Sequence, residues 1–572
     1  MATRSARSLA DSGLVGSIPT PIPTLIPIPT LIAVPNESAG DTQAKNLFSL
    51  FLHHHLAPEI PMHAADLLSH RARLTPEREA LVELATGQRY SFAALNFRAN
   101  RLAHLLQRLG VAQGDRVSIL AHNGIAYIDV LFAVGKIGAI FAPLNWRLAG
   151  RELAYILNDC RPKVLFVGPE FVDTLAALDF GTHRPEYVAL AGASIEGALD
   201  YDMGLEQSSD REPKRPRLDA ESPYCILYTS GTTGRPKGAV IPHRQVLWNC
   251  INTAASWGLT EQDISPVFVP LFHVGGLFVF ITPLFYLGGK ILLARGLEVE
   301  ESLRVIEQEG CTLILGVPTI YQMWLNSPGF ATADFSRVRW FISGGAPCPE
   351  ALMAAWRERK GVVFRQGYGL TEVGPNCFSM TDQESVQKSG SVGKPILHTE
   401  MRIVDASGQD SGVDEVGELL IRGPHVCTGY WKNTEASLQA IRSGWFHTGD
   451  MARRDADGCY FIVGRFKDMI ISGGENVYAA EVEAVVLEHP DVTEAALIGQ
   501  PDEKFGEVGL ILAVARAHST PSEESVLRIC ADRLAGYKVP KRVIFTDALP
   551  YSAYGKIQKA ELKERYLNSA KG

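Results

Sequence analysis

Short apolar runs separated by segments with a helical repeat dominate the chain from about Met62 onward. Runs such as KVLFVG (163–168), YCILYTS (224–230) and VRWFISGG (338–345) have the length of buried strands. Amphipathic segments such as PEALMAAWRERK (349–360) stand between several of them. Strands that alternate with helices in this way are typical of a largely parallel sheet, so the pattern predicts an α/β fold.

One helix is delimited by its own sequence, SFAALNFRANRLAHLLQRLG, over residues 91–110. Its apolar residues recur every three to four positions, as they do on the buried face of a helix. Ser91 is a favoured N-cap residue, and Gly110 stands where helices commonly end. We therefore expect a helix here, followed by a buried strand at DRVSILA (115–121).

The pattern changes after about Gly417. GELLIRG (417–423) and DMARRDADGCYFIVGR (450–465) resemble paired strands, with a turn at 455–458. AAEVEAVVLEHP (479–490) has the pattern of a short amphipathic helix. The last hundred or so residues are therefore expected to form a small α+β unit that follows the large α/β body.

The first sixty residues differ from the rest of the chain. IPTPIPTLIPIPTLI (18–32) spaces its prolines so closely that no helix can form, which predicts an extended or disordered state. We interpret this segment as a dispensable extension, with a transit peptide as the alternative. The expected parts are a proline-rich extension over 1–61, a large domain over 62–464 and a small lid domain over 465–572.

One uncharged apolar stretch, ISPVFVPLFHVGGLFVFITPLFYLGG (264–289), is long enough to cross a bilayer. Three prolines, a histidine and two Gly-Gly pairs interrupt it. We therefore expect buried chain beside a pocket, and no transmembrane span.

Composition narrows the class of protein. A net charge of −8 over 572 residues argues against a general nucleic-acid binder, because such proteins usually carry a basic excess. The nine cysteines contain no CxxC pair, which favours reduced thiols and a cytoplasmic location over a disulfide framework or a zinc site.

The segment YTSGTTGRPKGAVI (228–241) has the residues of a phosphate-binding loop. A Walker loop would continue from its lysine into a helix, whereas Lys237 is followed by Gly238 and a strand-like AVIP. The segment therefore predicts strand, loop, strand. Its glycines, hydroxyls and single cation supply the donors and the positive charge that a triphosphate needs.

This loop resembles the signature of the adenylate-forming superfamily, which includes acyl-CoA synthetases, luciferase and amino-acid adenylation domains. Seven further motifs occur in the family's order and extend the resemblance from about Met62 to the C-terminus. They are PLFHVGG (270–276), SGGAP (343–347), QGYGLTE (366–372), GELLIRGP (417–424), WFHTGD (445–450), GRFKDMIISGGENVYAAEVE (464–483) and YSAYGKIQK (551–559).

The resemblance implies two half-reactions. A carboxylate attacks the α-phosphate of ATP to give an acyl-adenylate and pyrophosphate, and a thiol then displaces AMP. Lys556 resembles the lysine that bridges carboxylate and α-phosphate, and Glu372 resembles the magnesium-associated acid. Thr371 is expected to bond the α-phosphate, and Lys237 the β- and γ-phosphates.

The resemblance also assigns nucleotide-binding and carrier residues. Tyr368 is expected to stack on adenine, Asp450 to accept from the ribose hydroxyls and Arg465 to contact ribose or phosphate. Lys467 matches the hinge between the domains. The remaining nucleotide residues are Thr229, Ser230, Gly231, Thr232, Thr233, Gly234, Gly344, Gly345, Ala346, Pro347, Gln366, Gly367 and Gly369, and Ser472, Gly473 and Gly474 are expected to line the route of the CoA arm.

The acid is expected to be apolar. An amino-acid substrate is disfavoured because residues 264–289 offer no carboxylate to pair with its ammonium. We expect the acyl pocket at His273, Gly275, Gly276 and Phe278, with His273 either gating its mouth or serving as a satisfied core histidine.

The sequences of the motifs are most similar to those of bacterial fatty-acyl-CoA synthetases, which predicts a medium- or long-chain fatty acid. The alternatives are an aryl or cinnamate-type acid, an enzyme that loads a carrier protein, and a degenerate member that binds nucleotide without catalysis.

Overall fold

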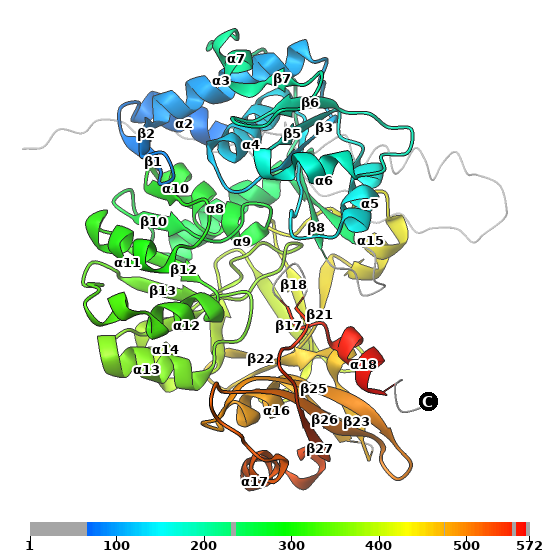
Figure 1. Cartoon of the computed structure of the whole chain (residues 1–572). Helices are drawn as coiled ribbons and strands as arrows, with labels where there is room; N and C mark the ends of the chain where they lie inside the picture. The colour runs from blue at the N-terminus through cyan, green and yellow to red at the C-terminus, as the bar shows by residue number, and fades with distance from the viewer. Residues whose placement is uncertain (1–65, 230–235, 474, 552–555, 568–572) are drawn as a thin grey trace, which may run out of the picture. The chain divides into compact units, whose positions relative to one another are not determined.

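The computed structural model describes residues 66–229, 236–473, 475–551 and 556–567 (Figure 1). The proline-rich extension lies outside these residues, so its predicted state stays a prediction. Within the described residues the strands form five sheets, and three sheets of the large body include parallel pairs. The α/β body with a small C-terminal α+β unit, predicted from the sequence pattern, is confirmed.

The largest sheet has eight strands in the order β19-β9-β8-β4-β3-β5-β6-β7. Its neighbours from β8 through β7 are parallel, whereas β8, β9 and β19 pair antiparallel. Its strands are β3 (Arg116–Leu120), β4 (Ile140–Pro143), β5 (Val164–Val167), β6 (Glu186–Ala189), β7 (Leu199–Asp200), β8 (Pro223–Thr229), β9 (Lys237–Pro242) and β19 (Gly429–Tyr430).

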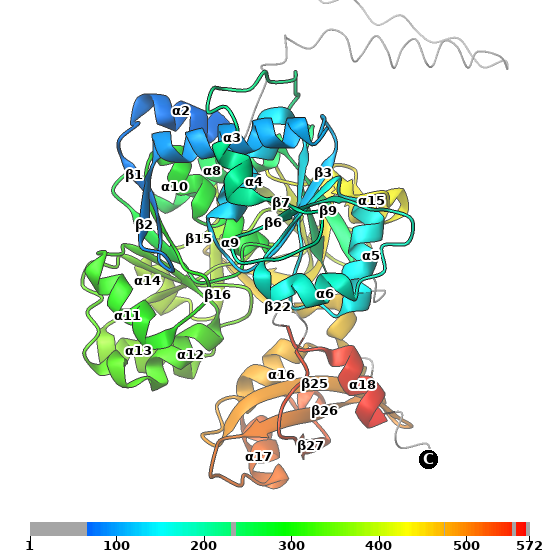
Figure 2. The same ribbon diagram turned by 45° about the horizontal axis from the view of Figure 1, so that its top comes forward.

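Helices cover both faces of this sheet (Figure 2). One face packs with α3 and α4 into a core that includes Val117 and Phe141, and the other packs with α5 around Leu120 and Ile140. This alternation follows from the period of two in a strand. The helices here are α2 (Asp66–Leu74), α3 (Phe92–Arg108), α4 (Ile125–Ile137), α5 (Gly150–Cys160), α6 (Val172–Ala176), α7 (Tyr201–Glu206) and α8 (His243–Trp257).

Helix α3 is the helix that the sequence delimits. The Ser91 side chain accepts a hydrogen bond from the Ala94 backbone N–H, as an N-cap does. The chain leaves the helix through Gly110, whose φ of 74° lies in the left-handed region that glycine tolerates.

The apolar stretch over 264–289 does not form one helix. It is divided among β10 (Ile264–Val267), α9 (Val274–Phe278) and α10 (Ile281–Leu287). The strand joins a four-stranded sheet, order β10-β11-β1-β2, with β11 (Lys290–Leu293), β1 (Glu79–Glu83) and β2 (Gln88–Ser91). No helix among the described residues is long and apolar enough to cross a membrane.

A three-stranded parallel sheet, order β12-β13-β14, carries the motifs SGGAP (343–347) and QGYGLTE (366–372). Its strands are β12 (Leu313–Gly316), β13 (Trp340–Ser343) and β14 (Phe364–Gln366). Trp324 and Trp356 are fully buried in the core beside it. The accompanying helices are α11 (Val299–Gln308), α12 (Pro318–Asn326) and α13 (Glu350–Lys360).

The hairpins predicted after Gly417 belong to a seven-stranded antiparallel sheet. Its order is β15-β16-β22-β21-β18-β17, and β20 pairs with β21. The strands are β15 (Phe378–Ser379), β16 (Ser391–Pro395), β17 (Glu400–Val404), β18 (Gly417–Arg422), β20 (Ile441–Arg442), β21 (Trp445–Arg454) and β22 (Tyr460–Arg465), and the helices near it are α14 (Asp382–Gln387) and α15 (Thr434–Ala440).

The C-terminal unit is built on a five-stranded sheet, order β24-β23-β26-β25 with β27 beside β26. Helices α16 and α17 share one core with it, and α18 shares another. Its elements are β23 (Ile470–Ser472), β24 (Glu475–Val477), α16 (Ala479–Val486), β25 (Val492–Asp502), β26 (Gly506–Ala515), α17 (Glu523–Arg533), β27 (Arg542–Phe545) and α18 (Lys559–Leu567).

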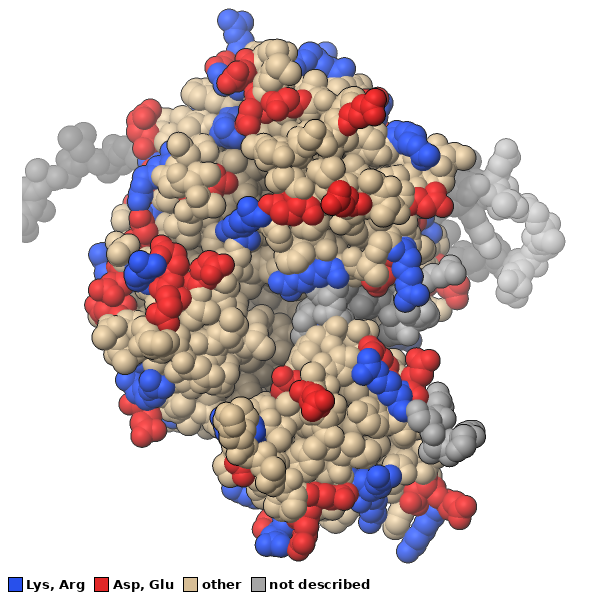
Figure 3. Space-filling view, in the orientation of Figure 1, with Lys and Arg blue, Asp and Glu red and all other residues tan. Residues whose placement is uncertain are grey.

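The distribution of charge and thiols agrees with the composition. Acidic and basic side chains are interspersed on the face shown in Figure 3, which is unlike the basic surface of a general nucleic-acid binder. All nine cysteines are free and buried. Burial raises the pKa of the Cys160 thiol to about 12, so this group stays protonated at neutral pH.

Candidate active site

The phosphate-loop motif is flanked by two paired strands. Strand β8 runs into the loop and β9 leaves it, antiparallel, with Thr229 opposite Lys237. Gly238 packs so closely on β8 that a Cβ there would lie 2.6 Å from the Ile226 Cγ2 atom. This pairing confirms the predicted strand, loop, strand order. The predicted residues Ser230, Gly231, Thr232, Thr233 and Gly234 lie outside the described residues.

The two motifs of the predicted adenine site lie side by side at the carboxyl edge of the three-stranded sheet. The Gly344 N–H donates to the Gly316 carbonyl at 3.1 Å, and the Gly367 N–H donates to the Ser343 carbonyl at 2.8 Å. Gly345 has a φ of 80°, which requires glycine and turns the chain toward Ala346 and Pro347. Ligands commonly bind outside this edge of parallel strands.

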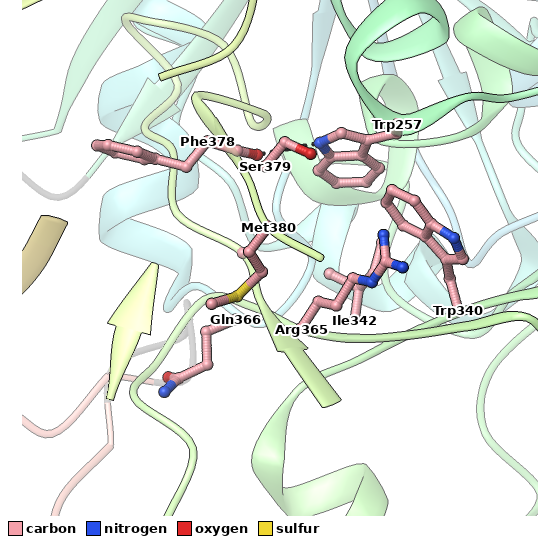
Figure 4. Close-up of a pocket in the computed structure, with 9 residues that line it drawn as sticks. Trp257, Trp340, Ile342, Arg365, Gln366, Phe378, Ser379 and Met380 are labelled. Carbon is pink, nitrogen blue, oxygen red and sulfur yellow. Dashed lines mark hydrogen bonds between the residues drawn. The ribbon is translucent and has the colours of Figure 1, made fainter. Parts of the chain in front are cut away.

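A small pocket lies beside this edge and is shown in Figure 4. It encloses about 10 Å³, which suits about one water molecule and no larger ligand. Gln366 and Gly367 belong to both the pocket and the predicted nucleotide site. The aromatic rings of Trp257 and Trp340 line it, 5.6 Å apart. We interpret it as a packing gap behind the site.

Tyr368 joins the predicted adenine site to the predicted ribose site. Its hydroxyl donates to Asp450 Oδ2 at 2.6 Å, and Arg465 Nε lies 2.9 Å from Asp450 Oδ1. Asp450 and Arg465 are directly opposite each other on β21 and β22. Burial, followed by the nearby Asp450 charge, raises the pKa of Tyr368, which keeps its hydroxyl a donor. A carboxylate has further lone pairs, so Asp450 can still accept from a diol.

Thr371 and Glu372 lie in a turn that other segments hold in place. Gln245 of α8 donates through Nε2 to the Thr371 carbonyl at 3.1 Å, and the Cys427 N–H donates to the Glu372 carbonyl at 2.7 Å. The Tyr430 hydroxyl donates to Glu372 Oε1 at 2.9 Å. Both predicted residues are buried. The surroundings therefore fix the backbone of the turn and one oxygen of the carboxylate.

Lys556 is within electrostatic range of this turn although it comes from the C-terminal unit. Lys556 is solvent-exposed as a residue, but the protein atoms around its ammonium lower the pKa of this group by desolvation. The charge of Arg465 lowers this pKa further, whereas Asp450 and Glu372 raise it. Residues predicted as catalytic or nucleotide-binding from motifs far apart in the sequence are thus brought together.

His273 caps the short helix α9, where its Nδ1 accepts from the Gly275 N–H at 3.1 Å. Burial lowers its pKa to about 4, and the charges of Lys556 and Arg147 contribute. His273 is therefore neutral at pH 7 and lies within range of Lys556. This position agrees with both predicted roles, at the pocket mouth and as a satisfied histidine.

The other predicted pocket residues pack into the protein. A Cβ on Gly276 would lie 2.2 Å from the Pro270 carbonyl oxygen, so this glycine is required by backbone packing. Phe278 is 2% exposed and belongs to the main core. Backbone packing alone therefore explains Gly276, and its expected place in the acyl pocket stays a prediction.

Lys467 lies in a three-residue 3₁₀ turn between β22 and β23, and its role as a hinge stays a prediction. Ser472 and Gly473 stand at the turn between β23 and β24, where the Gly473 N–H donates to the Phe505 carbonyl. Gly474 is outside the described residues. Ser472 is paired with Glu475 and Gly506, and Gly473 with Phe505, all within the C-terminal unit, so their role toward CoA stays a prediction.

Two residues of the site carry no signal of their own in the sequence. Tyr430 belongs to a Gly-aromatic pair, and Gln245 lies in the first turn of a helix. Their roles depend on contacts with Glu372 and Thr371, which are distant in the chain. Only a tertiary structure reveals such contacts.

The donor set fits the predicted magnesium ion. No group of three or more metal-binding side chains occurs in the part of the chain that the structure describes. Magnesium takes one or two carboxylates and leaves its other positions to phosphate oxygens and water. Glu372 can supply such a carboxylate, because only one of its two oxygens accepts a hydrogen bond from Tyr430.

Two family models match most of the described chain. The family model described as AMP-binding enzyme matches residues 68–431, and the model of the AMP-binding enzyme C-terminal domain matches residues 481–556. The matched ranges include Lys237, Glu372 and Lys556.

Similar proteins include both aryl and fatty acid ligases. A feruloyl-CoA synthase of an Amycolatopsis species is 40% identical over 87% of this chain and 97% of its own length. A long-chain-fatty-acid–CoA ligase of Mycobacterium tuberculosis is 35% identical over 87% and 98%. A crystal structure of an anthranilate CoA ligase in complex with anthranoyl-AMP superposes with a TM-score of 0.82 at 28% identity, over 90% of this chain and 99% of that one.

Proposed function

Since the chain belongs to the AMP-binding enzyme family and is an acid–CoA ligase, we propose that it activates an aryl carboxylic acid as its adenylate and transfers the acyl group to CoA. The observation that carries this proposal is the position of Lys556 within electrostatic range of Glu372 and Asp450. A cation held at a nucleotide site can stabilise the negative charge that develops on the α-phosphate during adenylation.

In the first step a carboxylate oxygen of the acid attacks the α-phosphorus of ATP, and the bond to the pyrophosphate oxygen breaks. Two anions approach each other, so their repulsion must be screened. Lys556 would bridge the carboxylate and the α-phosphate, while Lys237 would hold the outer phosphates. Magnesium, when bound at Glu372, would neutralise the phosphate charge.

In the second step the thiol sulfur attacks the carbonyl carbon of the adenylate, and AMP leaves with the phosphate oxygen. Lys556 belongs to the C-terminal unit, and Lys467 lies in the turn that joins this unit to β22. Rotation about that turn would withdraw Lys556 and bring Ser472 and Gly473 to the site. Hinge motions of this kind commonly separate two steps of a reaction.

Three observations favour an aryl acid. The relative with 40% identity is a feruloyl-CoA synthase, and the superposed anthranilate ligase holds an aryl adenylate. In this chain Gly276 and Phe278 are packed into the core, which gives no support for a long acyl tunnel along α9. Substrates with a compact ring suit this arrangement better than long chains.

A fatty acid is the second candidate. The 35% identity to a long-chain-fatty-acid–CoA ligase favours it, as do the apolar residues around His273. A carrier-protein thiol in place of CoA is a further alternative for the acceptor. The nine buried thiols favour a reducing compartment such as the cytoplasm as the place of action.

The test is a screen of pyrophosphate release with matched aryl and fatty acids, followed by chromatography of the thioester. Ferulate, 4-hydroxybenzoate and indole-3-acetate would be compared with octanoate and palmitate, each with ATP, magnesium and CoA. Aryl-CoA formation at a higher kcat/KM would support the proposal. Preference for palmitate would select the fatty acid candidate, and acylation of a phosphopantetheinyl carrier without acyl-CoA would overturn the CoA assignment.

A further inference from the structure

Tyr430 lies between two charged groups of the site. Its hydroxyl donates to Glu372 Oε1 at 2.9 Å, and the ammonium of Lys237 lies 5.5 Å from the centre of its ring. Resting on the function proposed above, we propose that Tyr430 is a positioning residue that holds the metal-associated carboxylate and the phosphate-loop lysine in a fixed relation for the binding of MgATP.

The backbone fixes Tyr430 relative to the lysine. Strand β19 pairs antiparallel with β9, and Tyr430 is opposite Ala239. The next residue, Trp431, donates through its N–H to the Gly238 carbonyl at 2.7 Å. Lys237 is the first residue of that same strand. The ring and the lysine side chain are therefore carried by two hydrogen-bonded strands and move together.

The same short segment also fixes the carboxylate. The Cys427 N–H donates to the Glu372 carbonyl at 2.7 Å, while the Tyr430 hydroxyl reaches the side chain of Glu372. Residues 427–431 thus contact the backbone and the carboxylate of Glu372 on one side and β9 on the other. A displacement of this segment would move both charged groups.

A tyrosine serves better here than direct contact between the charges. No ion pair joins Lys237 to Glu372 among the described residues, and Tyr430 contacts both side chains. A direct pair would neutralise both groups and make each less available to a ligand. A cation over an aromatic ring and a hydrogen bond to one carboxylate oxygen are weaker contacts. They leave Lys237 able to bind phosphate and leave the Oε2 atom of Glu372 for the metal.

The test compares ligands with and without the outer phosphates. Calorimetry in the absence of any acid would give the dissociation constants of MgATP and of AMP for the wild type, Tyr430→Phe and Tyr430→Leu. Loss of a hydrogen bond to a charged group predicts a dissociation constant for MgATP about tenfold higher in Tyr430→Phe, and higher still in Tyr430→Leu, which also removes the ring. AMP lacks the outer phosphates, so its dissociation constant should stay within about twofold and confirms that the variants are folded.

Tyr201→Phe is the matched control. Its hydroxyl also donates to a buried carboxylate, Asp129 Oδ2, but this pair lies between α4 and α7 and touches no residue assigned to the site. Its MgATP affinity should equal that of the wild type. A Glu372→Ala background extends the test, because Tyr430→Phe should then add no further loss.

The possible results distinguish the positioning role of Tyr430 from the proposed ligase function. Equal MgATP affinity in the wild type and Tyr430→Phe would overturn the positioning role, as would an equal loss for AMP and MgATP. An undiminished effect of Tyr430→Phe in the Glu372→Ala background would show that Tyr430 does not act through this carboxylate. A wild-type protein that fails to bind MgATP would instead refute the proposed ligase function.

Discussion

The hydroxyl of Tyr368 is hydrogen-bonded to Asp450 at 2.6 Å, across 82 positions of the chain. The two residues were expected to contact different parts of the nucleotide, adenine and ribose. Their direct bond makes them one unit, in which the aromatic residue orients the carboxylate. Arg465 completes the unit from the other oxygen of Asp450.

Replacement of Tyr368 by Phe should weaken the binding of AMP as well as of ATP. The ring remains, but the buried carboxylate of Asp450 loses a donor, and a hydrogen bond to a charged group contributes about 1.5–3 kcal/mol. We therefore expect the dissociation constant of AMP to rise about tenfold or more. Calorimetric titration with AMP measures this change. An unchanged value would show that Asp450 needs no help from Tyr368.

Replacement of Lys556 by Ala should abolish the first half-reaction and spare the second. Loss of a charge that stabilises the transition state typically costs roughly 10²–10³-fold in rate. Pyrophosphate exchange measures adenylation, and thioester formation from added acyl-AMP measures the second step. A variant that keeps normal adenylation would disprove the assigned role of Lys556.

His273 should make the protein less stable as the pH falls from about 6.5 to about 4. Its pKa is about 4 in the folded protein and 6.5 in the unfolded chain, so in this range the unfolded state binds the additional proton. The free energy of unfolding lost through this group is at most about 3 kcal/mol. Because His273 is partly exposed, screening by solvent makes the loss smaller. Below pH 4 both states are protonated, and the contribution no longer changes.

Urea unfolding at pH 4.5 and 7 would compare the wild type with His273→Asn. Asparagine can still cap α9 but does not titrate. The variant should therefore lose less stability on acidification than the wild type. Parallel pH profiles for both proteins would exclude His273 as the source.

Replacement of Gly276 by Ala should destabilise the fold. The new Cβ would lie 2.2 Å from the Pro270 carbonyl oxygen, and relief of such overpacking costs about 1–3 kcal/mol. Gly296→Ala is the matched control, because no atom lies within 4 Å of its Cβ position. A lower urea midpoint in Gly276→Ala alone is expected. Equal urea midpoints for the two variants, together with a changed substrate range in Gly276→Ala, would indicate that Gly276 lines the acyl pocket.

Local pattern predicted the features that depend on neighbouring residues. The helix after Ser91 and the paired strands around the phosphate loop follow from periodicity and caps. The expectation of which side chains share a site came from the resemblance to a known family, and the roles it assigns stay predictions.

Contacts between distant side chains could not be predicted in this way. The bonds from Tyr430 to Glu372 and from Gln245 to Thr371 depend on how separate elements pack. The close approach of Gly276 to the Pro270 carbonyl oxygen could not be predicted for the same reason, and its place in the acyl pocket stays a prediction. Residues 230–235 are outside the described chain, so the predicted donors of the loop stay predictions.

The burial of every cysteine makes this protein convenient for single-position labelling. Alkylating reagents need an accessible thiolate, and burial raises the pKa of thiols such as Cys348, to about 11, and Cys160. One cysteine introduced on the exposed surface of the C-terminal unit, for example in place of Glu524, should therefore react far faster than the nine native thiols. A fluorophore attached there could follow rotation about Lys467 in real time, without first preparing a cysteine-free background.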